Sequence, residues 1–167
     1  MQLRDVLEPD LKTAEKHYQT ILDAILQYTD FCDQNGDEGF SEYEKLELEL
    51  NLLTGKDMSM YNLAEWWEEE GAEPLAFKIS LPDPLIIDDI SKEELKEIVT
   101  RLKTCIAPSE EDGSFHSQFY FHLDDYYHSL LSLNFGGYEL KLFQRNKDKS
   151  GNYFEYPVDD IVERIWS

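Results

Sequence analysis

A run of oxygen-bearing side chains, DQNGDEGFSEYE, has nearly the spacing of a calcium-binding loop. An EF-hand loop takes its oxygen ligands from positions 1, 3, 5, 7, 9 and 12, and it needs glycine at position 6 for a sharp turn. Position 6 is Glu38 here, and only glycine reaches the required backbone angles cheaply. We therefore favour a solvated turn between two helices. An EF-hand-like calcium-binding module is the alternative, with ligands at Asp33, Asn35, Asp37, Gly39, Ser41 and Glu44.

Signatures of catalysis do not occur in the sequence. It has no nucleophile elbow, no glycine-rich phosphate loop and no HExxH zinc motif. His122 and His128 lie near a pair of aspartates in the sequence, but their spacing is not that of zinc ligands on a helix. Carboxylates are so frequent that finding two together says nothing about acid–base catalysis. We expect neither an enzyme nor a bound metal or cofactor.

A tryptophan pair inside a dense acidic run is the first candidate for a binding surface. Adjacent side chains on a helix point about 100° apart, so one indole can enter the core while the other stays near the surface. An exposed tryptophan with a rim of carboxylates would suit a basic partner. The alternative is that both indoles belong to the core. The residues are Glu65, Trp66, Trp67, Glu68, Glu69 and Glu70.

A second candidate surface combines acids and tyrosines in the C-terminal half of the chain. Tyrosine offers a large contact area and a hydrogen bond at small entropic cost. The residues are Asp124, Asp125, Tyr126 and Tyr127. Further acidic groups lie at Asp88-Asp89, Glu110-Glu111-Asp112 and Asp159-Asp160.

The net charge restricts the class of partner. The 167 residues include 36 acidic and 15 basic side chains, a formal net charge of −21. Such a chain repels nucleic acid and anionic membranes and favours a basic protein partner, although solubility or adaptation to high salt is an alternative reason. The two cysteines form no CxxC motif, the N-terminal segment is charged, and no apolar run is long enough to span a membrane. We expect a cytoplasmic protein.

The N-terminal part, residues 1–72, is predicted to be mainly helical. Apolar residues at three- and four-residue spacing indicate an amphipathic helix over Asp10–Phe31 and a second over Ser41–Thr54. Gly55 suits the position just after the end of that second helix. A third helix is expected over Asp57–Glu70, which would carry the tryptophan pair.

The remaining part, residues 73–167, is predicted to be α+β. Ser91 and Glu94 form the pattern of a capping box at the start of a helix over residues 91–106, and a C-terminal helix is expected over Val158–Trp166. Gly136-Gly137 is a hairpin signal. Weak alternation predicts a strand over residues 74–81. Alternating aromatic-rich segments predict strands over residues 117–123, 126–135, 138–145 and 152–157.

These elements predict the fold class. N-terminal helices are followed by an antiparallel β-meander with packed helices, in a single domain over residues 1–167. One segment has an alternative, because residues 124–133 could instead form a short helix capped by Asp124.

The chain has a recognisable profile. It is most evident in the stretch AEWWEEE and in the C-terminal stretches FYFHLDDYYHSLLSLNFGGYELKLF and YFEYPVDDIVERIW. The chain is small, strongly acidic and aromatic, and it resembles bacterial immunity proteins, in particular those of contact-dependent growth inhibition and related polymorphic toxin systems. The resemblance implies tight binding of one cognate toxin domain, often a basic nuclease, so that the toxin's active site or substrate surface is covered. Acidic side chains would take the place of phosphates and aromatic anchors would slow release. A DNA mimic that inhibits a nuclease is a further alternative.

Overall fold

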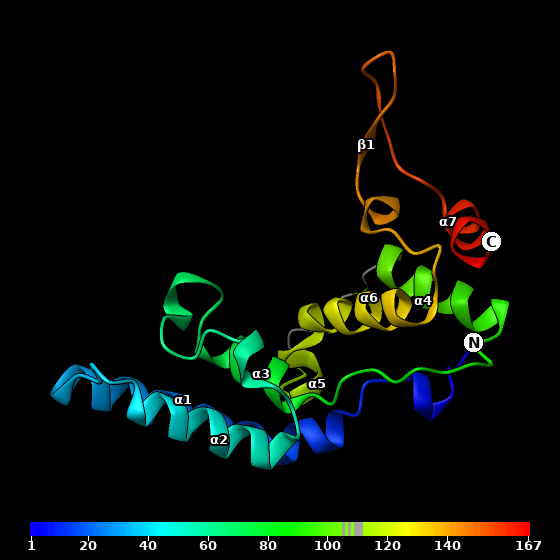
Figure 1. Cartoon of the computed structure of the whole chain (residues 1–167). Coiled ribbons are helices and arrows are strands. Elements are labelled where there is room, and N and C mark those ends of the chain that lie inside the picture. The colour runs from blue at the N-terminus through cyan, green and yellow to red at the C-terminus, as the bar shows by residue number, and fades with distance from the viewer. Residues whose placement is uncertain (105, 107, 109–111) are drawn as a thin grey trace. The chain divides into compact units, whose positions relative to one another are not determined.

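The computed structural model describes residues 1–104, 106, 108 and 112–167. Cys105 and the acidic residues Glu110 and Glu111 lie outside the described residues. The chain divides into two compact units, shown in Figure 1. Unit 1 consists of Met1–Pro9 and Asp83–Ser167, and unit 2 consists of Asp10–Pro82. The expectation of a single domain stays a prediction.

The expected antiparallel β-meander is wrong. The described residues contain seven α-helices, several short 3-10 turns and a sheet of only two strands, so the chain is mainly helical and not α+β. No helix in the described part of the chain is both long and apolar enough to cross a membrane.

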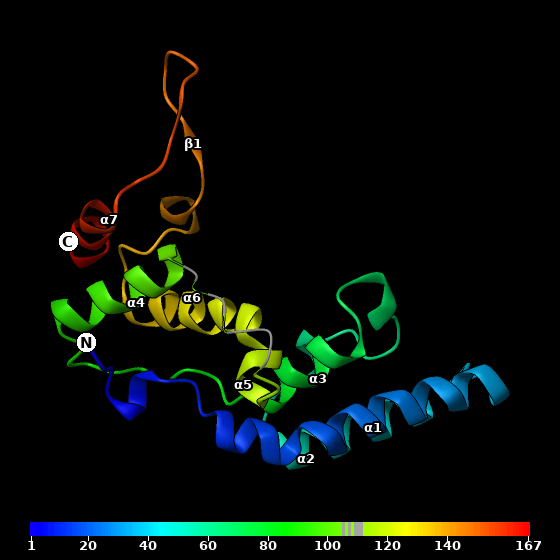
Figure 2. The same cartoon turned by 180° about the vertical axis from the view of Figure 1, so that it is seen from behind.

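Unit 2 is built on a helical hairpin. Helix α1 (Leu11–Asn35) and helix α2 (Ser41–Thr54) lie side by side in both views of the molecule (Figures 1 and 2). The side chain of Asp10 caps α1 by accepting a hydrogen bond from the Thr13 amide. The buried face of α1 follows the predicted helical spacing: Ala14, Tyr18, Ile21, Leu22, Ile25 and Tyr28.

Helix α3 (Ala72–Ser80) stands where a strand was expected over residues 74–81, so that prediction is wrong. The apolar run is buried almost all round, at Ala72, Leu75, Ala76, Phe77 and Ile79. A short apolar run of this kind fits a buried strand and a buried helix equally well, and packing against α1 decides the outcome. Pro74 lies in the first turn of α3, where its missing N–H costs nothing.

The expected helix over Asp57–Glu70 is also wrong. Two 3-10 turns replace it, η2 (Met58–Met60) and η3 (Trp66–Glu68). The Asn62 side chain accepts hydrogen bonds from the amides of Ala64 and Glu65. A side chain that binds nearby backbone amides in this way competes with helix formation and favours a turn.

Unit 1 packs helix α4 (Lys92–Thr104) against α6 (Leu123–Asn134) and α7 (Val158–Trp166). The capping box at the start of α4 is confirmed, because the Glu94 amide donates to Ser91 Oγ (3.2 Å) and the Ser91 amide donates to Glu94 Oε2 (2.8 Å). The predicted C-terminal helix is confirmed with its bounds. The remaining elements are η1 (Asp5–Leu7), α5 (Phe115–Gln118), η4 (Tyr120–His122) and η5 (Leu140–Phe143).

Most of the strands expected in unit 1 are helical. Residues 117–123 fall in α5 and η4, and residues 138–145 include η5. Residues 126–135 lie mostly in α6, so the helical alternative for that segment is the correct one, although Asp124 lies in its first turn and does not cap it. Among the residues that the structure describes, only β1 (Asn146–Lys147) and β2 (Tyr153–Phe154) pair as strands, in an antiparallel hairpin whose register joins Asn146 to Phe154.

The N-terminal segment is fixed to unit 1 by two groups of charged hydrogen bonds. Arg4 donates to Glu94 (Nε–Oε1, 2.6 Å) and to both oxygens of Asp89. Arg101 donates from Nη1 to both oxygens of Glu8, at 3.0 and 2.9 Å, and the Tyr127 hydroxyl donates to Glu8 Oε2 at 2.9 Å. Residues 1–9 are therefore an integral part of unit 1.

Candidate functional site

The tryptophan pair of unit 2 divides between the core and the surface. The Trp66 indole donates a hydrogen bond from Nε1 to Thr29 Oγ1 on α1 (3.0 Å), and its ring is half-buried. Trp67 remains 57% exposed. The two rings meet edge to face, with centroids 5.5 Å apart, a geometry that aromatic pairs prefer. One indole thus holds the other in place.

The backbone around this pair is held by specific contacts. Leu63 is fully buried, and its amide donates a hydrogen bond to the Tyr43 hydroxyl on α2 (3.4 Å). After the 3-10 turn, Gly71 adopts a φ of 105° and its amide donates to the Trp66 carbonyl (3.2 Å). Such a φ strongly favours glycine, so Gly71 allows the chain to turn from the tryptophans directly into α3.

Four carboxylates surround the pair in sequence, and all four are exposed: Glu65, Glu68, Glu69 and Glu70. Glu70 forms an ion pair with Lys78 of α3 (2.8 Å). Within the described residues, the other three have no ion pair. Residues 57–77 contain six acidic and no basic side chains. The exposed indole therefore lies in a strongly negative part of unit 2, and we call Glu65–Glu70 the aromatic–acidic site.

A cleft of about 250 Å³ opens beside the aromatic–acidic site. Its apolar walls are Met60, Tyr61, Trp66 and Leu75, and its acidic residues are Glu69 and Glu70. Met60 is 79% exposed, so the apolar surface continues outside the cleft. Met60 and Tyr61 were not among the predicted site residues, because an isolated methionine and tyrosine in a turn give no periodic signal.

The candidate calcium ligands lie at the end of α1, at the start of α2 and in the turn between them. Asp33 and Asn35 lie in the last turn of α1, and Asn35 donates to the Phe31 carbonyl of the same helix. Asp37 accepts hydrogen bonds from the amides of Tyr43 (3.0 Å) and Glu42 (3.3 Å) and from the Tyr28 hydroxyl (3.2 Å). Its carboxylate therefore serves the N-terminus of α2.

The electrostatics of Asp37 agree with this role. Partial desolvation raises the pKa of Asp37, but the hydrogen bonds from the backbone amides of Tyr43 and Glu42 and from Tyr28 outweigh it, so the pKa lies below its ordinary value. The other predicted ligands, Gly39, Ser41 and Glu44, are exposed. Among the described residues, no three His, Cys, Asp or Glu side chains converge as a metal site would require.

The second predicted surface is only partly accessible. Tyr126 and Tyr127 are both buried in unit 1. The Tyr126 hydroxyl donates to the Glu8 carbonyl (3.3 Å), and the Tyr127 hydroxyl bonds with Glu8 and with Arg101. Asp125 is exposed and Asp124 is half-buried. The two tyrosines serve the core of unit 1, so they offer no ring face to a partner.

The histidine near these aspartates is also structural. His128 Nδ1 lies 3.0 Å from the Tyr138 hydroxyl, and its ring packs edge to face on Phe143. Burial lowers the pKa of His128, although the charges of Asp124 and Asp125 act in the opposite direction. Burial likewise raises the pKa of Asp124. His128 therefore serves packing within unit 1.

The aromatic–acidic site thus combines the exposed indole of Trp67 with three carboxylates that have no ion pair among the described residues. Comparison of the chain with models of known protein families, with curated proteins and with solved structures gives no significant match.

Proposed function

We propose that this chain is an immunity protein that binds and neutralises a basic toxin domain, a nuclease being the favoured class, in the cytoplasm. The observation that carries the proposal is the exposed indole of Trp67, which is fixed by Trp66 and flanked in sequence by three carboxylates without an ion pair among the described residues, Glu65, Glu68 and Glu69. The centres of tight protein interfaces are usually aromatic residues surrounded by contacts that exclude water.

The charge of unit 2 fits a basic partner. Residues 10–82 contain 17 acidic and 5 basic side chains, a net charge of −12. A surface of this sign attracts a nucleic-acid-binding groove and speeds the encounter with it. The carboxylates of the aromatic–acidic site would occupy the positions that phosphates take in the substrate complex, and Trp67 would slow dissociation.

The calcium alternative has less support from the site. Asp37, at position 5 of the loop, already accepts three hydrogen bonds from groups of its own unit. A calcium ion would have to compete with those donors for the same oxygens. We therefore favour the immunity function over a calcium-binding module.

The proposal is tested by affinity capture from lysate of the native cell, with the wild-type chain and three variants as bait. Trp67→Ala removes the anchor, and Glu68→Lys reverses one charge of the rim. Glu15→Lys is the matched charge control, because Glu15 is also exposed in unit 2 but lies about 20 Å along α1 from Thr29, the residue that holds Trp66. Each capture is done with calcium and with chelator.

A basic domain that the wild-type chain and Glu15→Lys retain, and whose toxic activity the chain abolishes at equal concentration, is the expected result. Trp67→Ala should weaken its binding about 30-fold, the size of a hot-spot contribution of about 2 kcal/mol. Glu68→Lys should slow association at low salt. Retention of the same domain by all three variants with equal affinity would refute the aromatic–acidic site. Capture only with calcium would favour the alternative.

A further inference from the structure

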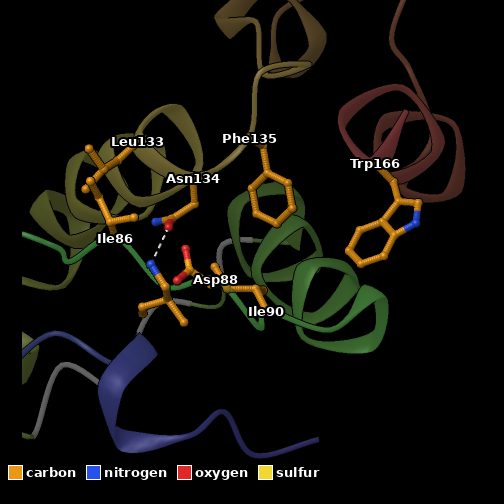
Figure 3. A pocket seen from close by; sticks show the side chains of 8 residues that line it. Ile86, Asp88, Ile90, Leu133, Asn134, Phe135 and Trp166 are labelled. Atoms are coloured by element: carbon orange, nitrogen blue, oxygen red, sulfur yellow. Dashed lines mark hydrogen bonds between the residues drawn. The ribbon is translucent and has the colours of Figure 1, made fainter.

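A groove of about 380 Å³ lies in unit 1, between residues 86–90 and the ends of two helices (Figure 3). Six of the eight residues that line it are apolar, among them Ile86, Leu133, Phe135 and Trp166. Ile86 is 71% exposed and Trp166 is 44% exposed, so much of this apolar surface faces solvent. Asp88 and Asn134 supply the polar side chains of the groove.

Asn134 holds the floor of the groove in place. Its Oδ1 accepts a hydrogen bond from the Ile87 amide (2.7 Å), and its Nδ2 donates to the carbonyls of Leu85 (2.9 Å) and Leu130 (2.9 Å). These bonds tie the extended segment before α4 to the end of α6. They also occupy both amide hydrogens, so Asn134 has no donor left for a ligand.

The polar groups that remain in the groove are acceptors. Asp88 is exposed and has no ion-pair or hydrogen-bond partner among the residues that the structure describes. Figure 3 shows its carboxylate pointing into the groove, while the indole nitrogen of Trp166 is turned away from it. Helix α6 ends at Asn134 and α7 ends at Trp166. Helix C-termini carry partial negative charge, which adds to that of Asp88.

We propose that this groove binds an arginine side chain presented by a partner protein. The aliphatic stem would pack on Ile86 and Leu133, and the guanidinium would reach Asp88. The planar guanidinium can also stack on the rings of Phe135 and Trp166, which an ammonium group does less well. Burying the stem while pairing the head is how long basic side chains use mixed surfaces.

This proposal does not depend on the proposed function, since the groove and the aromatic–acidic site belong to different units. The test follows the indole N–H resonances of the three tryptophans by NMR. The probe is a capped leucyl-arginyl-leucine tripeptide, titrated at millimolar concentration and constant salt. The same peptide with citrulline in place of arginine keeps the shape and removes the charge.

The Trp166 resonance is expected to shift and saturate with the arginine peptide, while the citrulline peptide binds at least about fivefold more weakly, as loss of a charge-assisted hydrogen bond predicts. Asp88→Asn should remove this preference for arginine. Glu93→Gln, the loss of another exposed carboxylate of unit 1, should leave it unchanged.

Three results would overturn the proposal. The first is equal binding of the arginine and citrulline peptides. The second is an equal preference for the arginine peptide in Asp88→Asn and Glu93→Gln. The third is a Trp166 indole resonance that does not shift at any peptide concentration. A shift of Trp166 with protein concentration alone would also overturn it, because the groove would then be occupied by a second copy of the chain.

Discussion

Gly136 and Gly137 are adjacent, and we predict that replacement by alanine lowers stability at Gly137 but not at Gly136. A Cβ atom on Gly137 would lie 2.6 Å from the carbonyl oxygen of Arg164 and 2.8 Å from that of Ile165. Both atoms belong to the backbone of α7, so neither can rotate aside. A Cβ on Gly136 would meet nothing within 4 Å.

The magnitudes follow from two opposing terms. Forcing extra volume into a packed contact costs about 1–3 kcal/mol. Alanine also restricts the unfolded chain, which stabilises the folded state by about 0.4–1 kcal/mol where its conformation is allowed. Gly137→Ala should therefore lower the free energy of unfolding by about 1–2 kcal/mol. Gly136→Ala should leave it unchanged or raise it by up to about 1 kcal/mol.

The assay is urea unfolding followed by far-UV circular dichroism, since the chain is mainly helical. The Trp166 indole resonance is a second readout, because Gly137 contacts the last turn of α7, which ends at Trp166. It should move in Gly137→Ala and stay in place in Gly136→Ala. Equal effects of the two substitutions on stability would show that α7 does not pack closely on Gly137.

Three further predictions concern single contacts. Glu94→Gln removes the charge from a buried carboxylate that accepts hydrogen bonds from Arg4 and from the Ser91 amide. We expect the free energy of unfolding in urea at pH 7 to fall by about 2 kcal/mol, a figure that already allows for the exposure of Arg4. Glu93→Gln, at an exposed position, should cost far less. The hydrogen bond from Arg4 holds the pKa of Glu94 below its ordinary value, so the gap between wild type and Glu94→Gln should be full above about pH 5 and shrink as the pH falls further; a gap that is constant with pH would contradict this. Asp37→Ala should lower the melting temperature, whereas Asp33→Ala, on an exposed turn of α1, should not, and equal melting temperatures would argue against capping of α2 by Asp37. Trp66→Phe should destabilise unit 2 by about 1 kcal/mol through loss of the bond to Thr29, while Trp67→Phe should leave stability unchanged, and the reverse order would exchange the roles of the two indoles.

The helices that the sequence predicted well are mostly those with both a periodic apolar face and a terminal signal. The helix over Ser41–Thr54 has the predicted bounds, with Gly55 in the left-handed conformation just after it. The helix that starts at the Ser91–Glu94 capping box was predicted for the same reasons, whereas the C-terminal helix was predicted from its apolar residues alone. In each case local and tertiary preferences agree, so the sequence alone was sufficient.

The aromatic segments of unit 1 misled the prediction because their composition favours strands. In α6, Leu123, Tyr126, Tyr127, Leu130 and Leu131 are buried at helical spacing, so packing overrides the β-propensity of the tyrosines. The sequence predicts a hairpin at the glycine pair, yet the pair follows α6, and Gly137 lies close to the backbone of α7. A glycine needed for contact with a distant backbone cannot be distinguished, from sequence, from one needed for a turn.

The candidate site was predicted in part. The sequence left two interpretations open, one exposed indole or both indoles in the core, and the structure agrees with the first, because Trp66 is half-buried and Trp67 is exposed. The expected reason was wrong, because the division comes from a 3-10 turn and a bond to Thr29 and not from an α-helix. The groove around Asp88 was not predicted, since it depends on Asn134 joining segments 47 residues apart.

The docking of residues 1–9 onto unit 1 has a consequence for the order of folding during synthesis. The bonds of Arg4 and Glu8 to Glu94 and Arg101 span 90 and 93 residues, and closing loops of that length costs about 4 kcal/mol of chain entropy. Unit 2 lies wholly between the partners, so it can fold on the ribosome before unit 1 is complete. We expect pulse-labelled hydrogen exchange to protect α1 before α4. Residues 1–9 would then reach their native contacts after the residues of unit 2, although they precede unit 2 in the chain.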